Sequence, residues 1–269
     1  MMTDTSPYLS ILQLSDLHIL KAPEYTMLGV NTWHYFQACL EQAVSEAKRR
    51  FDLILLTGDL AQDPCPASYQ RILTALEAYD TPCICLPGNH DDYALMQQIF
   101  CTDKVNCQRH ISIDNWQLIC LNSQIQDSPN GYLPEQELLF LEDCLSNTPD
   151  QHTLIAVHHH CLMTDSAWLD TMIIKNRIDF LSILRKYPQV KAITTGHIHQ
   201  SKETITDGIL VLGSPSTCFQ FKPHSKEFSL DTTQPGYRMI NLYTDGHIES
   251  SITLYPEPLH GLQIHTRSY

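Results

Sequence analysis

The sequence lacks long apolar segments. No apolar run reaches the roughly 18 residues that a membrane-spanning helix needs. The first ten residues, MMTDTSPYLS, contain neither the basic nor the apolar segment of a signal peptide. We therefore expect no membrane insertion and no secretion, and a cytoplasmic location.

Basic residues are also scarce. Lys and Arg number 17 against 30 Asp and Glu, so the formal net charge is −13. Nucleic acids and anionic membrane surfaces bind through clustered basic side chains, and this sequence clusters none, so we expect neither as a partner. A small anionic substrate stays compatible with this charge, because bound metal cations can reverse the field locally.

No C-x-x-C pair occurs, although the chain contains ten cysteines. Cys83, Cys85 and Cys120 fall inside apolar runs, as interior residues do. In a chain without a secretion signal this usage indicates reduced, structural thiols rather than a disulfide framework.

The chain shows no internal repeat, low-complexity tract or linker. Apolar runs of strand length alternate with segments of helical periodicity, which indicates an α/β fold with antiparallel pairing towards the C-terminus. We expect strands within 9–18, 51–60, 82–92, 110–123 (a hairpin), 152–160, 190–199 and 208–255, and helices within 32–50, 66–80, 133–147 and 176–187.

Side chains of the metal-binding types follow five of these strands. They are Asp16 and His18, Asp59, Asn89 with His90, His158, and His197 with His199. Each motif alone is ordinary turn or surface chemistry. Together they predict one site, because ligands of open α/β sheets bind beyond the carboxyl ends of the strands.

The spacing suggests how these groups would bind. In an extended strand, the side chains of residues i and i+2 point to the same side. Asp16 and His18 are therefore expected to share one ion, and His197 and His199 are expected to share one as well. Carboxylates mixed with imidazoles favour Fe, Mn or Zn over Ca or Mg. Seven ligands among these eight side chains suit two ions, with Asp59 as the bridge. Two ions about 3.5–4 Å apart activate water for phosphoryl displacement.

Neighbouring polar residues receive supporting roles. His159 is expected to point to the opposite face from His158, and neither it nor His160 is assigned as a ligand. Asp91 and Asp92 are expected to orient ligands or to cap a helix.

The ordered motifs D-x-H, GD, GNHD, H and GHxH resemble those of the calcineurin-like metallophosphoesterases. The resemblance implies a four-layer α-β-β-α sandwich with a dinuclear metal site at the carboxyl ends of the strands. It also implies a single domain over residues 1–269, with the metal-site core at about 9–200 and C-terminal strands at about 201–269. The implied metal ligands are Asp16, His18, Asp59, Asn89, His158, His197 and His199. His90 matches the histidine that contacts the substrate phosphate or protonates the leaving group.

A narrower resemblance covers nearly the whole chain. MLGVNTW (27–33), TGDLAQD (57–63), LPGNHD (86–91), VHHH (157–160), GHIHQ (196–200) and SPSTCFQFKPH (214–224) are similar to segments of the bacterial class III 3′,5′-cyclic AMP phosphodiesterases. This implies hydrolysis of cAMP to 5′-AMP by a metal-activated hydroxide, in a monomer or homodimer. Fe and Mn are the favoured metals, and Zn is compatible. His18, Asn89, His90 and His199 would contact the substrate.

Three alternatives remain open. The enzyme could be a broader metallophosphodiesterase acting on 2′,3′-cyclic nucleotides or other phosphoesters, or the fold could serve as a non-catalytic scaffold. Phe219 and Phe221 are expected either to pack in the core or to wall a nucleoside pocket, and core packing is the preferred interpretation.

Overall fold

The computed structural model describes residues 9–267. One six-stranded sheet is made of Leu9–Leu14 (β1), Leu53–Thr57 (β2), Cys83–Leu86 (β3), Val105–Asn106 (β4), Gly236–Leu242 (β15) and Ile248–Leu254 (β16). Its order is β16-β15-β1-β2-β3-β4. β1, β2 and β3 are parallel, and β15 joins β1 in the antiparallel direction. The carboxyl ends of the first three strands therefore lie at the same edge.

The second six-stranded sheet is made of His110–Ile113 (β5), Trp116–Leu121 (β6), His152–Val157 (β9), Val190–Thr195 (β10), Lys202–Thr206 (β11) and Ile209–Gly213 (β12). Its order is β11-β12-β10-β9-β6-β5, with β6, β9, β10 and β12 parallel. Two short ribbons stand apart from the sheets: Gln124–Ile125 (β7) with Ser128–Gly131 (β8), and Gln220–Phe221 (β13) with Leu230–Asp231 (β14).

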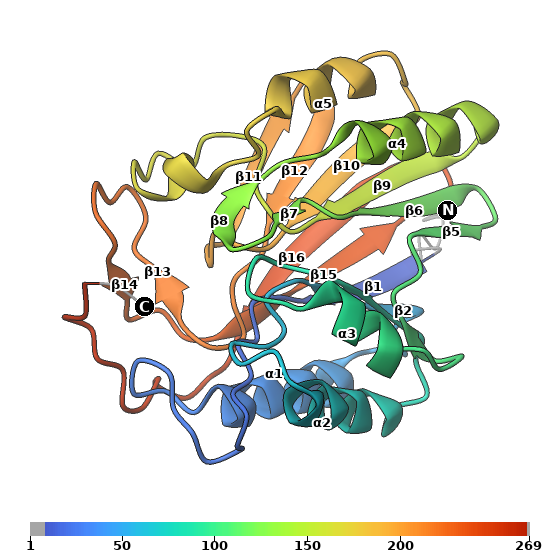
Figure 1. The fold of residues 1–269 in the computed structure, drawn as a ribbon. Coiled ribbons are helices and arrows are strands. Elements are labelled where there is room, and N and C mark those ends of the chain that lie inside the picture. The colour runs from blue at the N-terminus through green and yellow to red at the C-terminus, as the bar shows by residue number, and fades with distance from the viewer. Residues whose placement is uncertain (1–8, 268–269) are drawn as a thin grey trace, which may run out of the picture.

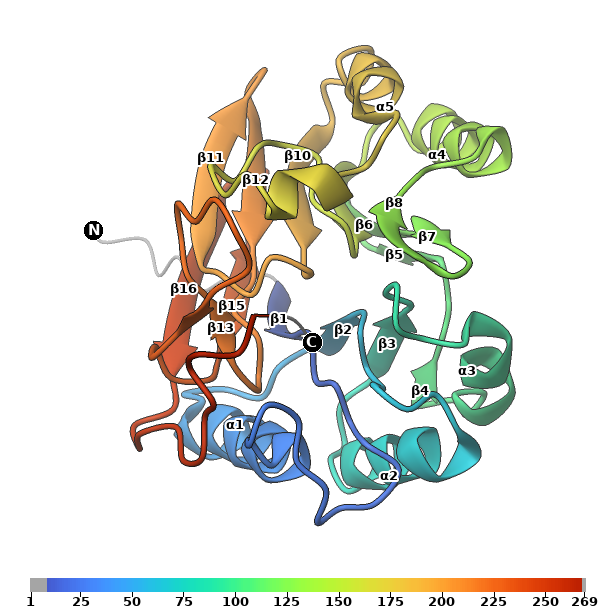
Figure 2. The same ribbon diagram turned by 60° about the vertical axis from the view of Figure 1, so that its left-hand side comes forward.

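Helices cover the outer face of each sheet. The first sheet carries Thr32–Glu46 (α1), Pro66–Glu77 (α2) and Tyr93–Ile99 (α3), and the second carries Glu135–Asn147 (α4) and Arg177–Leu184 (α5). A 3₁₀ helix, Leu169–Met172 (η1), precedes α5. Figures 1 and 2 show the two sheets packed between these helical layers, which confirms the predicted α-β-β-α sandwich. No helix within residues 9–267 has the length and apolar character that a membrane crossing requires.

The central strands of the first sheet, such as β2 and β3, are almost entirely apolar because both of their faces are buried. In β1, Ile11 faces the second sheet and packs in a cluster with Leu118 and Leu154, whereas Leu12 packs with the helices. All ten cysteines lie in the described part of the chain and are unpaired, and seven of them are buried. The expectation of reduced interior thiols is confirmed.

The short strands β4, β7 and β8 and the helix η1 were not predicted, and two larger differences affect α3 and the C-terminus. Helix α3 was not expected, because its seven residues contain only one fully buried side chain, Met96, and show no readable periodicity. The C-terminal strands were expected over about 201–269, but they end at Leu254, and residues 255–267 contain no helix or strand. Pro256 and Pro258 explain this end, since proline cannot donate a hydrogen bond to a neighbouring strand.

Candidate metal centre and active site

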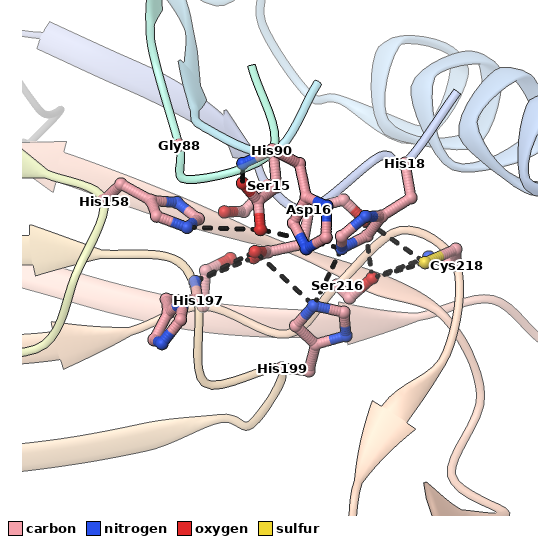
Figure 3. Close-up of polar contacts among 12 residues, drawn as sticks. Ser15, Asp16, His18, Gly88, His90, His158, His197, His199, Ser216 and Cys218 are labelled. Atoms are coloured by element: carbon pink, nitrogen blue, oxygen red, sulfur yellow. Dashed lines mark hydrogen bonds and ion pairs between the residues drawn. The ribbon is translucent and has the colours of Figure 1, made fainter. Parts of the chain in front are cut away.

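Five strands from the two sheets end beside one another and carry the predicted residues. β1 leads to Asp16 and His18, β2 to Asp59, β3 to Asn89, β9 to His158, and β10 to His197 and His199. Figure 3 shows the side chains of Asp16, His18, His158, His197 and His199 converging on one place from these strand ends. The carboxylates and imidazoles that come after these strands are buried, except for the His90 imidazole, which is half-buried.

The backbone at these strand ends is not extended. Asp16, His18, Asp59, His197 and His199 all have positive φ angles, between 46° and 66°. The left-handed conformation costs roughly 1–2 kcal/mol for a residue with a side chain, and it persists where the surroundings enforce it. The premise of an extended chain was therefore wrong, because each of these residues turns the chain sharply. Asp16 and His18 still lie in one cluster, as expected.

Asp16, His18 and His199 form one group of possible ligands. His18 donates from Nδ1 to Gln62 Oε1 over 2.9 Å, and His199 donates from Nδ1 to the carbonyl of Phe219 over 2.8 Å. Each Nε2 therefore keeps a lone pair, and the two Nε2 atoms lie 3.2 Å apart. Asp16 Oδ1 lies 3.5 Å from His199 Nε2. Lone pairs and a carboxylate that face one another in a buried site are the arrangement that a cation stabilises.

Asn89 and His158 form the start of a second group. His158 donates from Nδ1 to the carbonyl of Thr57 over 2.8 Å, which turns Nε2 towards Asn89 Oδ1 at 3.2 Å. Asp59 Oδ2 lies 3.3 Å from His158 Nε2 and 3.8 Å from His18 Nε2. Asp59 thus stands between the two groups, as the predicted bridging carboxylate would.

His197 belongs with this second group. Its ring lies 5.1 Å from that of His158, and its buried Nε2 has no hydrogen-bond partner within residues 9–267. The expectation that His197 and His199 bind one ion together was wrong, because the left-handed turn sends their side chains apart. His159 was expected to face away, but its ring packs 4.6 Å from that of His197. Its Nδ1 pairs with Ser123 Oγ at 2.8 Å.

The donor set fits two cations. We call Asp16, His18 and His199 the Asp16 group, and Asn89, His158 and His197 the His158 group. The ligand atoms of Asp16, His18 and His199 lie within 4.8 Å of one another, as do those of His158, His159 and His197. Asp59 belongs to two further clusters of this size, one with Asp16 and His158 and one with His18 and His90. Each group offers oxygen and imidazole ligands, the set that Fe, Mn and Zn accept.

Burial and neighbouring charges set the ionisation of these groups. Burial lowers the pKa of His18 to about 4 and raises that of Asp16 to about 7. Burial alone would raise the pKa of Asp59, but His158 and His90 hold it well below its ordinary value. Burial would likewise lower the pKa of His158, yet the Asp59 carboxylate raises it to about 9. The metal-free site therefore holds a proton between Asp59 and His158, which a cation must displace.

The loop after β3 is held against the centre by close contacts. A Cβ on Gly88 would lie 2.2 Å from Asp59 Oδ1, so only glycine fits there. The Asp91 carboxylate accepts hydrogen bonds from the backbone N–H groups of Leu60, Ala61 and Gly88. Asp91 therefore joins two ligand-bearing loops, as predicted for a supporting residue.

Asp92 also performs the role expected of it. Its side chain accepts a hydrogen bond from Leu95 N over 3.0 Å at the N-terminus of α3.

Phe219 and Phe221 are buried, and the Phe221 ring stacks on His199 with centroids 4.1 Å apart. The preferred interpretation of these aromatics as core residues is confirmed.

His90 lies at the open side of the centre. Its backbone N–H donates to Asp59 Oδ1 over 2.9 Å, and its ring lies 5.1 Å from that of His18. Together with Asn89 and His197 it lines a hollow of about 500 Å³ that opens beside the metal groups.

Comparison with known proteins decides the family. Residues 9–201 match the family model of the calcineurin-like phosphoesterases. The chain belongs to this family. Membership implies two divalent metal ions, which the two groups of ligands fit.

Two bacterial relatives are similar over most of the chain. The 3′,5′-cyclic adenosine monophosphate phosphodiesterase CpdA of Vibrio vulnificus is 39% identical over 91% of this chain and 89% of its own length. CpdA of Escherichia coli K12 is 40% identical over 90% and 88%, respectively. A dimetal phosphatase from Danio rerio has the same fold, with a TM-score of 0.66 at 14% identity, covering 93% of this chain and 100% of its own. The predicted resemblance to bacterial cAMP phosphodiesterases is confirmed.

Proposed function

We propose that this protein hydrolyses 3′,5′-cyclic AMP to 5′-AMP. The observation that carries the proposal is the pair of ligand groups joined by Asp59, next to a hollow large enough for a nucleotide. Its relatives named as cAMP phosphodiesterases, at about 40% identity over nearly the whole chain, support the choice of substrate.

The Asp16 group and the His158 group would each hold one divalent cation, with Asp59 shared between them. When bound, two such ions would neutralise the charge of a phosphodiester and lower the pKa of a water molecule. Mn and Fe are our preferred metals, and Zn is compatible with the ligands. The hydrogen bonds from His18, His158 and His199 to oxygen acceptors would keep each Nε2 aimed at the centre.

Hydrolysis forms one bond from phosphorus to a water oxygen and breaks the bond from phosphorus to O3′. The departing O3′ needs a proton, and we assign its donation to His90, because this half-buried imidazole lies beside the centre and lines the hollow. His18, Asn89 and His199 would complete the contacts to the phosphate. These side chains stand at the ends of three different strands, so substrate position would depend on the packing of both sheets.

We also propose that residues 1–269 act as one domain in the cytoplasm, as a monomer or homodimer. Neither a nucleic acid nor a membrane is proposed as a partner, because the net charge of −13 opposes both.

The test is hydrolysis of 3′,5′-cAMP by the metal-loaded protein, with products separated by chromatography. We expect 5′-AMP as the product, and loss of activity in Asp59→Ala. 2′,3′-cAMP and bis-p-nitrophenyl phosphate serve as comparison substrates. Activity on these two alone would refute the assignment of cAMP and support a broader phosphodiesterase, and activity on none of the three would support a scaffold.

A further inference from the structure

The hollow beside the metal groups has an aromatic wall that the ligand set does not explain. Trp168 and Phe228 line it, together with Met172 from η1. Its volume of about 500 Å³ lies within the ~300–1,000 Å³ typical of small-molecule sites. Asn89, His90 and His197 line the same hollow, so a phosphate held by these residues would leave the rest of a nucleotide near the aromatic side chains.

Trp168 is fixed in place by a chain of rings that begins at the metal centre. His199 stacks on Phe221 at 4.1 Å, and Trp168 meets Phe221 nearly at right angles at 4.9 Å. Phe228 meets Trp168 at 5.2 Å and 78°. Such edge-to-face contacts hold an indole rigidly, so little conformational entropy is lost when a ligand stacks on it.

The backbone around Trp168 is equally well determined. Trp168 precedes η1, where Asp170 Oδ1 accepts hydrogen bonds from Thr164 N and Thr164 Oγ1 over 2.7 and 2.8 Å. Thr171 donates from its hydroxyl to the carbonyl of Trp168 over 2.6 Å. The loop between β9 and α5 thus presents the half-buried indole as part of a preformed wall.

We propose that this hollow is the nucleoside subsite and that the base of the substrate stacks on Trp168. The inference rests on the proposed function and adds to it a residue that determines specificity. Base–aromatic stacking is worth a factor of about 5 to 150 in affinity. Trp168 therefore favours a cyclic phosphate that carries a base over one that does not.

The test compares cAMP with methyl riboside 3′,5′-cyclic phosphate, which keeps the sugar and the cyclic ester but has no base. Trp168→Ala should lower kcat/KM for cAMP about 5- to 150-fold, mainly through KM, and leave the base-free ester nearly unchanged. Trp168→Phe should keep most of the preference. Trp33→Ala is the matched control, because Trp33 packs on Phe36 and Arg71 away from the hollow and should change neither substrate.

An equal loss for both substrates in Trp168→Ala would overturn the proposal, because it would assign Trp168 a purely structural role. No loss for either would overturn it as well. A wild-type protein that hydrolyses neither cyclic ester refutes the proposed function, and the subsite is then tested by AMP binding. Titration of AMP into metal-loaded protein should quench tryptophan fluorescence in the wild type and in Trp33→Phe but not in Trp168→Phe. Unchanged quenching in Trp168→Phe would refute the stacking.

Discussion

The two ligand groups should bind cations with different pH dependences, because each must lose a different proton. In the His158 group the proton sits on His158, whose pKa the Asp59 carboxylate raises to about 9 in spite of burial. In the Asp16 group it sits on Asp16, whose pKa burial raises to about 7. A cation displaces these protons, so affinity falls as pH drops below the pKa in question.

The magnitude follows from the two pKa values. At pH 7 about one His158 in a hundred lacks the proton, so the affinity of the His158 group should be about 100-fold below its value above pH 9. That is a loss of roughly 3 kcal/mol. The affinity of this group should rise about tenfold per pH unit up to about 9, whereas that of the Asp16 group should level off above about 7.

The assay is calorimetric titration of metal-free protein with Mn²⁺ from about pH 6 to about pH 8.5, in buffers that differ in ionisation enthalpy. At about pH 8 one binding event should release about one proton and the other almost none. His158→Gln keeps a polar side chain but cannot titrate, so it should remove the release. Equal pH dependence of both events, or proton release that survives in His158→Gln, would refute the reasoning.

Three further predictions concern the loop after β3. His90→Ala should lower kcat on cAMP about 10²- to 10⁴-fold but spare bis-p-nitrophenyl phosphate, whose leaving group needs no proton; equal losses in steady-state kinetics would exclude general-acid catalysis. Gly88→Ala should abolish metal binding and activity, because the added Cβ would overlap Asp59. The control is Gly208→Ala, which has open space around it and should lower only the melting temperature. A fully active Gly88→Ala variant would contradict the packing. Asp91→Asn should cost about 1–3 kcal/mol in urea unfolding, because an amide N–H₂ cannot accept the backbone hydrogen bonds, while Asp92→Asn, still a good cap, should change little.

The sequence pattern was sufficient to predict the α/β class and the position of the centre, and the resemblance to the calcineurin-like metallophosphoesterases added the four layers. Apolar runs such as 51–60 are strands buried on both faces, and a polar residue directly after such a run, like Asp59, must lie at the sheet edge. The division of ligands between the ions could not be predicted in this way. This division depends on the left-handed backbone conformation of His197 and His199. The alternation of side chains along a strand does not predict such a conformation.

Trp168 and His159 show a second limit of what can be predicted from the sequence. Trp168 lies in a loop, and it reaches the hollow only through packing on Phe221 and Phe228, more than 50 residues later in the chain. His159 reaches His197 because β9 and β10 are neighbours in the second sheet. Contacts of this kind are set by tertiary structure, since local periodicity carries no information about which loops meet.

The strained and buried residues of the centre oppose folding. Positive φ angles at Asp16, His18 and Asp59 and the burial of two carboxylates each cost free energy. Bound cations would offset part of this cost, since ligands that bind only the native state stabilise it. The strain is therefore best explained by a site that is shaped for its metals.

The central claim is that two cations bind here and share Asp59. Its most direct test is a crystal structure of Mn²⁺-loaded protein with anomalous difference maps. We expect two peaks, one among Asp16, His18 and His199 and the other among Asn89, His158 and His197, with Asp59 Oδ2 between them. A single peak, or a second peak that Asp59 does not contact, would contradict the dinuclear centre.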